Sequence, residues 1–204
     1  MKNFSGIEYE NKVYEQINLF DLEFEDCVFK NCKFSECNII NCIFSDCKFI
    51  GCTFVELVTK NVNVLFADFD SCTIIGVKWH ELQKGSISFP IGKLKDCYLK
   101  YNQFDRLNFK KFDFKNSSIV DSTFARCDLS ESSFKNCDLK STDFIECNIT
   151  KSDFRGAKGY NIDIMKNNTK GAKFSYPEAV SLLKYFNIVI EKWFSTDFWR
   201  VFER

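Results

Sequence analysis

Cysteine and histidine are the residues of this chain with the most chemistry to offer, and their spacing argues against a reaction centre. The 204 residues include 11 Cys and 1 His. Zinc sites use close pairs of the form Cys-x2-Cys, often with His, whereas the cysteines from Cys27 to Cys52 recur at every fifth position without a histidine. The single His80 lies in a polar segment, where a histidine is more often a surface residue than a general base. We therefore expect no catalytic residues, no metal site and no cofactor, and we predict that the protein is not an enzyme.

The same period of five decides the fold. Two residues after each of these cysteines stands a large apolar residue, as at Phe29, Phe34 and Phe44. A helix repeats its apolar face at 3.6 residues and a strand at 2, so neither explains a repeat of five that keeps its phase. We name the large apolar position the centre and the position two before it the small position. The centres run from Phe4 to Phe174, and all 11 cysteines stand at small positions.

A chain that turns a corner every five residues winds into a square coil of about 20 residues. Centre and small side chains point inward, while the other three of each five, mostly Asp, Glu, Lys, Asn and Ser, face water. Successive coils stack at the strand spacing of about 4.8 Å, so roughly eight coils give a rod about 40 Å long. Phe24 should stack on Phe44, Phe104 on Phe124, and Phe124 on Phe144. The sequence thus predicts an all-β solenoid over residues 1–174.

Free, buried thiols are the expected state of the cysteines. Cys27 and Cys47 fall on adjacent coils at a Cα separation of about 4.8 Å, which is within disulfide range. Stacked side chains that point the same way are poorly set for the disulfide dihedral angle, and free cysteine packs as a small hydrophobe. The N-terminus lacks the apolar segment of a secretory signal, and no run of about 18 or more apolar residues exists. We therefore expect a cytoplasmic protein without membrane contact.

Two segments interrupt the array. Thr59 is a poor centre, and Lys84 breaks the pattern within residues 80–93, which also hold Gly and Pro. We interpret residues 80–93 either as a loop that bulges from the rod or as an imperfect coil, since Phe89 keeps the phase. A long insertion there must have a length that is a multiple of five. If this segment projects, its candidate partner-binding residues are His80, Glu81, Lys84, Ser86 and Ser88.

The pattern changes after residue 174, where a C-terminal segment, residues 175–204, begins. Residues 175–178 (Ser-Tyr-Pro-Glu) are typical of a helix N-cap and first turn, and an apolar helical stripe follows. Residues 188–190 (Ile-Val-Ile) predict a short strand, and the last dozen residues are rich in aromatic side chains. Such an end either plugs the open end of the rod or forms a subunit interface. The candidate interface residues are Val180, Leu182, Leu183, Phe186, Ile188, Trp193, Phe194, Phe198 and Trp199.

The repeats resemble the pentapeptide-repeat family, whose pattern is a small residue, Asp or Asn, Leu or Phe, and two variable residues. Residues 127–131 (Cys-Asp-Leu-Ser-Glu) and 137–141 (Cys-Asp-Leu-Lys-Ser) follow that pattern. The resemblance covers roughly residues 4–174 and implies a right-handed quadrilateral β-helix. Residues 171–190 are similar to the C-terminus of Qnr-type quinolone-resistance and microcin-immunity members. In those relatives a C-terminal helix mediates a head-to-head homodimer, so the resemblance implies a homodimer here.

The resemblance also implies a function in binding a protein partner. Qnr-type members are thought to imitate duplex DNA, to bind type II topoisomerases, and to protect DNA gyrase and topoisomerase IV from quinolones or a related poison. The first 56 residues hold ten acidic and five basic residues, although the formal net charge of the whole chain is zero. We expect the acidic face of such a mimic at Glu23, Glu25, Asp26, Glu36 and Asp46.

Direct binding of nucleic acid is not expected. Basic residues are scattered singly, and no glycine-rich phosphate-binding loop is present. The alternative to topoisomerase binding is a structural or scaffolding module with an unrelated protein partner, which the neutral net charge favours. A continuous acidic stripe on the surface would support DNA mimicry, and alternating charges would support a scaffold.

Overall fold

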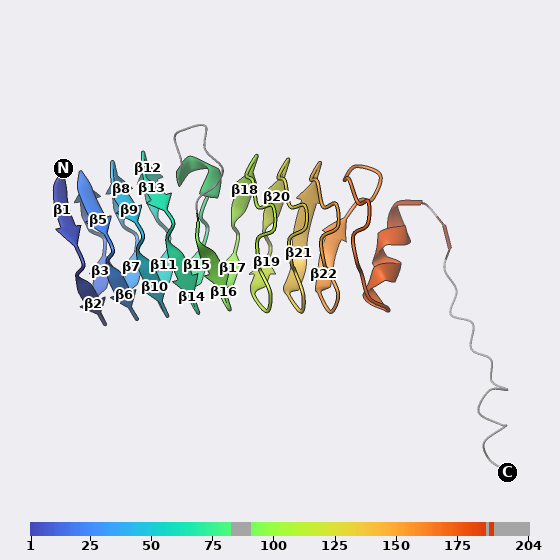
Figure 1. The fold of residues 1–204 in the computed structure, drawn as a ribbon, viewed down its shortest axis with the longest axis horizontal. Helices are drawn as coiled ribbons and strands as arrows, with labels where there is room; N and C mark the ends of the chain where they lie inside the picture. The colour runs from blue at the N-terminus through green and yellow to red at the C-terminus, as the bar shows by residue number, and fades with distance from the viewer. Residues whose placement is uncertain (83–90, 187, 190–204) are drawn as a thin grey trace, which may run out of the picture.

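The computed structural model describes residues 1–82, 91–186 and 188–189, and it shows a rod of stacked coils whose strands run parallel (Figure 1). The first strands are β1 (Lys2–Ser5), β2 (Glu8–Glu10), β3 (Val13–Glu15), β4 (Asn18–Phe20), β5 (Leu22–Glu25), β6 (Val28–Lys30), β7 (Lys33–Ser35), β8 (Asn38–Ile40), β9 (Ile43–Ser45), β10 (Lys48–Ile50), β11 (Thr53–Val55), β12 (Val58–Lys60), β13 (Asn63–Leu65), β14 (Asp68–Asp70) and β15 (Thr73–Ile75). They are followed by the 3-10 helix η1 (Trp79–Leu82), β16 (Lys93–Lys95), β17 (Tyr98–Lys100), β18 (Gln103–Asp105), β19 (Ser118–Val120), β20 (Thr123–Ala125), β21 (Asp138–Ile145), β22 (Lys158–Ile162) and the 3-10 helix η2 (Glu178–Phe186).

Each of the first coils contributes one strand to each of four faces, and in the later coils the first and second faces continue as isolated bridges such as Asn108↔Asp128 and Asp113↔Ser133. The first face is β1-β5-β9-β13, the second is β2-β6-β10-β14-β16, and the fourth begins with β4-β8-β12. The third face runs β3-β7-β11-β15-β17-β19, and β21, which turns a corner, joins it to β20 and β18. The predicted right-handed quadrilateral β-helix is confirmed.

The pairing register shows a regular coil of 20 residues and a longer coil that contains residues 80–93. Within the first coils the partners are 20 residues apart, as in Phe24↔Phe44. Across residues 80–93 the separation becomes 25, as in Asp68↔Lys93 and Thr73↔Tyr98, and it returns to 20 at Leu99↔Ile119. The chain between Lys78 and Lys93 therefore holds five additional residues, which agrees with the rule that only a multiple of five keeps the phase.

The core consists of the centre and small side chains, as predicted. Phe24 and Phe44 stack with ring centroids 5.0 Å apart, Phe104 and Phe124 at 4.4 Å, and Phe124 and Phe144 at 5.1 Å. The rings of neighbouring faces meet edge-on, as Phe134 and Phe144 do at 5.5 Å. Stacked and edge-to-face pairs are the two favoured arrangements of aromatic rings, so the Phe side chains of the core pack favourably both along the rod and between faces.

Corners are made by a residue with positive φ two positions after each centre. Asn31 (φ 51°), Asp46 (φ 53°) and Asn136 (φ 57°) are examples, and Gly51 (φ 63°) takes the same place in its coil. Asn, Asp and Gly tolerate this left-handed conformation better than other residues. The predicted corner every five residues is confirmed, and its left-handed backbone explains why these polar types recur there.

One coil near the C-terminal end departs from the predicted phase. The period of five places a weak centre at Gly159 and a centre at Ile164, but Tyr160 and Ile162 are the buried residues, at 4% and 1% exposure, while Ile164 packs half-buried against the core. The register shifts between Asp138↔Lys158 and Thr142↔Tyr160, so β22 advances two residues where β21 advances four. A Cβ on Gly159 would lie 2.7 Å from the Cα of Lys140, which means that only glycine permits this close approach.

The C-terminal segment differs from the expectation in three ways. The helix η2 is a 3-10 helix from residue 178 to 186, and none of its residues is fully buried. Ser175 does not cap it through its side chain: the Ser175 hydroxyl accepts a hydrogen bond from the backbone N–H of Gly156 at 2.9 Å, so it ties the segment to the preceding coil. Ile188 and Val189 lie outside any strand, so the predicted strand is wrong for these two residues.

Candidate interaction surfaces

The eleven cysteines are structural. All are free and buried. Their Sγ atoms donate to carbonyl oxygens of the preceding coil, as Cys47 does to Phe24 at 3.4 Å. Burial raises the pKa of the Cys47 thiol to about 12, and the same cause raises the pKa of Cys137 to about 12. Because the thiolate is the reactive form of cysteine, the Cys47 and Cys137 thiols are poor nucleophiles at neutral pH.

The part of the chain that the structure describes contains no group of three or more His, Cys, Asp or Glu side chains arranged to hold a metal ion. None of the helices within that part is long and apolar enough to cross a membrane. His80 lies half-buried on η1, and its Nδ1 is buried with no hydrogen-bond partner among the described residues. No second titratable side chain is bonded to it there, so the geometry provides no acid–base pair.

The predicted acidic residues gather on the first face and its two corners, with one exception. Glu23 and Glu25 lie on β5, Asp26 follows β5, and Asp46 follows β9 in the next coil. Since Glu25 and Ser45 are register partners, Asp26 and Asp46 are adjacent at about the strand spacing of 4.8 Å. Asp21, at the corner before β5, joins the same surface. We name these five carboxylates, Asp21, Glu23, Glu25, Asp26 and Asp46, the acidic patch.

Glu36 is the exception. It follows β7 on the third face, so the fourth face separates it from the acidic patch. Its carboxylate accepts a hydrogen bond from the Gln16 side chain at 2.8 Å. A continuous surface that included all five predicted residues would have to extend around two faces of the rod.

The acidic patch is uncompensated by basic side chains. Among the described residues, no Lys or Arg forms an ion pair with any of its five carboxylates. Elsewhere carboxylates are commonly paired across adjacent coils: Glu8 with Lys30 at 2.7 Å and Asp70 with Lys95 at 3.4 Å. The patch therefore keeps its negative charge available to a partner, whereas the paired carboxylates are already partly neutralised.

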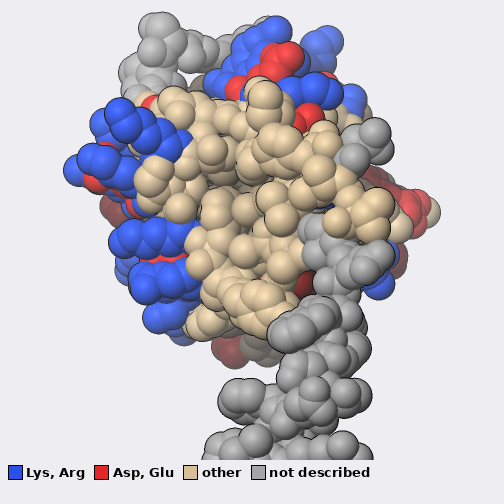
Figure 2. Space-filling model, turned by 90° about the vertical axis from the view of Figure 1, so that its right-hand side faces the viewer, with Lys and Arg blue, Asp and Glu red and all other residues tan. Residues whose placement is uncertain are grey.

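Basic side chains collect on the other half of the rod. Residues 1–82 hold 7 Lys and Arg against 13 Asp and Glu, and residues 91–189 hold 17 against 12. On the second face, Lys95, Lys115, Lys135 and Arg155 occupy equivalent positions of successive coils. Figure 2, which looks onto the C-terminal end, shows Lys and Arg gathered along the sides while uncharged residues cover the centre. Asp153 pairs with Lys135 at 3.3 Å and with Arg155 at 2.7 Å, so this column is not a bare cationic surface.

The loop candidates are only partly described. His80 and Glu81 lie on η1, and Glu81 pairs with Lys78 at 3.3 Å. Lys84, Ser86 and Ser88 lie outside the described residues, so their role in a partner-binding loop stays a prediction.

Four of the candidate dimer residues are exposed apolar side chains at the C-terminal end of the described part of the chain. Val180, Leu183, Phe186 and Ile188 are exposed by 38%, 38%, 43% and 54%. Leu182 instead packs, half-buried, against the core. The Glu178 carboxylate accepts the backbone N–H of Gly159 at 2.8 Å and so fixes the start of η2 on the last coil. Trp193, Phe194, Phe198 and Trp199 lie outside the described residues, so their part in an interface stays a prediction.

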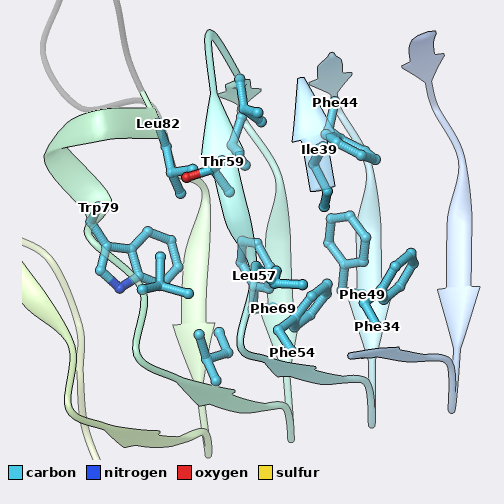
Figure 3. Close-up of a pocket in the computed structure, with 14 residues that line it drawn as sticks. Phe34, Ile39, Phe44, Phe49, Phe54, Leu57, Thr59, Phe69, Trp79 and Leu82 are labelled. Atoms are coloured by element: carbon cyan, nitrogen blue, oxygen red, sulfur yellow. The ribbon is translucent and has the colours of Figure 1, made fainter. Parts of the chain in front are cut away.

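A cavity of about 60 Å³ lies in the core of the first half (Figure 3). Side chains from all four faces line it, and Thr59 is the one polar residue among them. Thr59 follows Ile39 on the fourth face and is followed by Trp79, and it is the smallest of these three centres. The β12 strand that carries it pairs with β8 but with no other described strand, because the next coil continues as η1. The cavity is therefore a packing defect of the weak centre and offers little polar chemistry to a ligand.

Comparison with known proteins identifies the family of the repeat and two similar structures. The family described as pentapeptide repeat region matches residues 22–109 and 107–181. The chain is similar in structure to a trypsin-treated form of QnrB1, described as a plasmid-mediated fluoroquinolone resistance protein, with 16% identity, a TM-score of 0.49, and coverage of 94% of this chain and 99% of that one. It is also similar to HetL, a pentapeptide repeat protein from the cyanobacterium Nostoc sp. strain PCC 7120, with 11% identity, a TM-score of 0.35, and coverage of 84% and 89%.

By sequence, none of the curated proteins matches the chain. The two structural likenesses, at these identities, concern the fold alone. The family match spans most of the chain and coincides with the coils seen in the structure. The protein is a member of the pentapeptide-repeat family.

Proposed function

We propose that this protein is a non-enzymatic binding protein whose acidic patch occupies the DNA-binding surface of a type II topoisomerase, DNA gyrase or topoisomerase IV, and protects the enzyme from quinolones or a related poison. The observation that carries the proposal is the acidic patch: five carboxylates on one face of a rigid rod without a basic partner among the described residues. The similarity of residues 171–190 to Qnr-type C-termini gives the proposal its choice of enzyme.

The electrostatic argument concerns which charges are free to act. Duplex DNA presents about one negative charge per 1.7 Å of axis, so a surface that binds DNA is rich in Lys and Arg. A rod whose coils repeat at about 4.8 Å presents carboxylates in fixed rows without any cost of ordering them. Unpaired carboxylates can form new pairs with such a surface, whereas a carboxylate that already holds a lysine must first give it up.

The test is a gyrase supercoiling assay with ciprofloxacin, with and without the purified protein. The unchanged protein should restore supercoiling in the presence of the drug. The variant E23Q/E25Q/D26N/D46N should lose this protection, because it removes four of the five patch charges while leaving the core intact. The control variant E8Q/D68N/D70N removes carboxylates that are ion-paired and should protect as well as the unchanged protein. Absence of protection by the unchanged protein would contradict the proposal.

We also propose that the apolar surface of η2 joins two copies into a homodimer. Val180, Leu183 and Phe186 are each more than a third exposed on one short helix, and such clusters are common at subunit interfaces. The variant L183E should sediment as a monomer. M165E, which changes a residue 72% exposed outside η2, should sediment like the unchanged protein. Dimers of L183E, or a monomeric unchanged protein, would contradict this part.

A scaffolding module with a different partner is the second candidate. The second face of residues 91–189 favours it, because Asp153 pairs with Lys135 and Arg155 and so offsets part of the basic column there. Failure to protect gyrase or topoisomerase IV would select this function.

A further inference from the structure

Two of the positive-φ corners carry aromatic residues instead of the usual polar types. They are Phe66, at φ 53°, and Tyr101, at φ 58°. A bulky residue in the left-handed region is uncommon, because its Cβ approaches the following carbonyl oxygen. A residue in a disfavoured backbone conformation persists where its side chain contributes to packing or to function. We therefore asked what each of the two rings contacts.

A contact within the protein explains the ring of Tyr101, and the described residues offer no such contact to the ring of Phe66. The Nζ of Lys100 lies 4.6 Å from the centre of the Tyr101 ring, which is a favourable cation–π distance. Phe66 is 63% exposed, and its ring makes no aromatic or cationic contact with the described residues. The fold therefore gains little from an aromatic side chain at this corner.

The position of Phe66 connects it to the acidic patch. Phe66 follows β13 at the same corner of the rod where Asp26 follows β5 and Asp46 follows β9. The backbone N–H of Asp46 donates to the carbonyl oxygen of Leu65 at 2.8 Å, so Phe66 is one coil away from Asp46, at about 4.8 Å. Leu65, itself 36% exposed, widens the apolar area. Two carboxylates and an exposed aromatic ring thus form one row along a single edge.

We propose that Phe66 is the apolar anchor of the acidic patch. It enters an apolar pocket on the DNA-binding surface of the topoisomerase, and Lys or Arg at the rim of that pocket pair with Asp46 and Asp26. This inference rests on the proposed function and assigns its contact residue. Buried aromatic anchors carry a large share of the binding energy at protein interfaces, while charges around them mainly set the association rate and the choice of partner. DNA offers no comparable apolar side chain, so Phe66 allows the protein to bind this surface by more than charge.

The experiment compares F66N with Y101N in direct binding to purified gyrase, followed by fluorescence anisotropy at several salt concentrations. Asn is a common residue at these corners, so F66N should fold with an unchanged or higher unfolding midpoint. F66N should raise the dissociation constant about 30-fold, the effect of losing a strong anchor. It should leave the salt dependence unchanged, whereas D26N/D46N should weaken the salt dependence. Y101N should bind like the unchanged protein.

The outcomes separate this inference from the proposed function. If the unchanged protein binds and F66N binds equally well, Phe66 is not the anchor and the proposed function stands. If F66N and Y101N weaken binding by the same factor, the loss is not specific to the acidic edge and the inference is overturned. If the unchanged protein does not bind gyrase or topoisomerase IV, both the proposed function and the anchor are overturned.

Discussion

The two halves of the rod share one fold but differ in how tightly they are packed. From Phe24 to Ile74 the apolar centres are exposed by 1–8%, and from Leu94 to Phe154 by 0–2%. The first half contains the cavity beside Thr59, while the second half fills several small positions with Ser or Thr whose hydroxyls donate to the backbone. Thr142, for example, donates to the carbonyl oxygen of Ile119 at 2.7 Å.

The surface of the first half is also less favourable for stability than the surface of the second half. The first half carries the unpaired acidic patch and Phe66, an aromatic residue at a left-handed corner to which the described residues give no cation–π contact of the kind that Tyr101 makes in the second half. Both features cost stability. The second half pairs part of its charge, as Asp153 does with Lys135 and Arg155. Functional surfaces commonly retain features that the fold alone would not favour. Under the proposed function, partner binding falls to the first half, and the second half contributes mainly stability.

Truncation of a core phenylalanine in each half tests the packing difference with the largest expected effect. Phe124 and Phe49 are each stacked between two rings, at 4.4 and 5.1 Å and at 4.9 and 4.9 Å. F124A should lower the free energy of unfolding by about 4–5 kcal/mol and F49A by about 3 kcal/mol. Phe49 lines the cavity and so has fewer contacts to lose. Urea unfolding measures both, and equal losses would break the comparison.

Most of the fold could be predicted because the same spacing of small and centre residues recurs in nearly every coil. The spacing of Cys27 and Phe29 recurs at Cys127 and Leu129, so an error at one coil does not change the period. What the sequence could not reveal is where one coil departs from it. Tyr160 replaces Gly159 inside the rod because β22 advances two residues where β21 advances four, and this depends on the backbone approach to Lys140. That close approach depends on the tertiary structure, and the residues around Gly159 do not by themselves predict it.

The acidic patch could have been predicted more sharply than it was. Residues 20 apart stack, so Asp26 and Asp46 belong together, while Glu36 falls two faces of the square away from them. The same arithmetic places Phe66 in the row of Asp26 and Asp46. The ion pairs could not be predicted from the sequence. Spacing places a lysine one coil away from a carboxylate, but it does not specify whether the two side chains meet.

Two buried or half-buried threonines should respond with opposite signs. T142V removes a hydroxyl that donates to Ile119, leaving a buried carbonyl oxygen unpaired, and should cost about 1–3 kcal/mol. T59L places a larger side chain beside the cavity at a centre position and should stabilise the protein by about 1 kcal/mol. The measurement is the thermal unfolding midpoint of each variant. A destabilised T59L would show that the first half is not underpacked at this centre.

Removing charge from the acidic edge should give the smallest effect on stability, and the sign is informative. D26N/D46N abolishes repulsion between two adjacent unpaired carboxylates and keeps residues suited to a left-handed corner, so it should raise the free energy of unfolding by about 0.5 kcal/mol at low salt. The gain should fall towards zero in 1 M NaCl, where the screening length is about 3 Å. The matched variant D68N/D70N instead removes ion pairs with Lys93 and Lys95, at 3.5 and 3.4 Å, and should destabilise the protein by up to about 1 kcal/mol. If both variants changed stability in the same direction, the acidic patch would be electrostatically equivalent to the paired surface, and the distinction between a binding half and a stabilising half would lose its electrostatic basis.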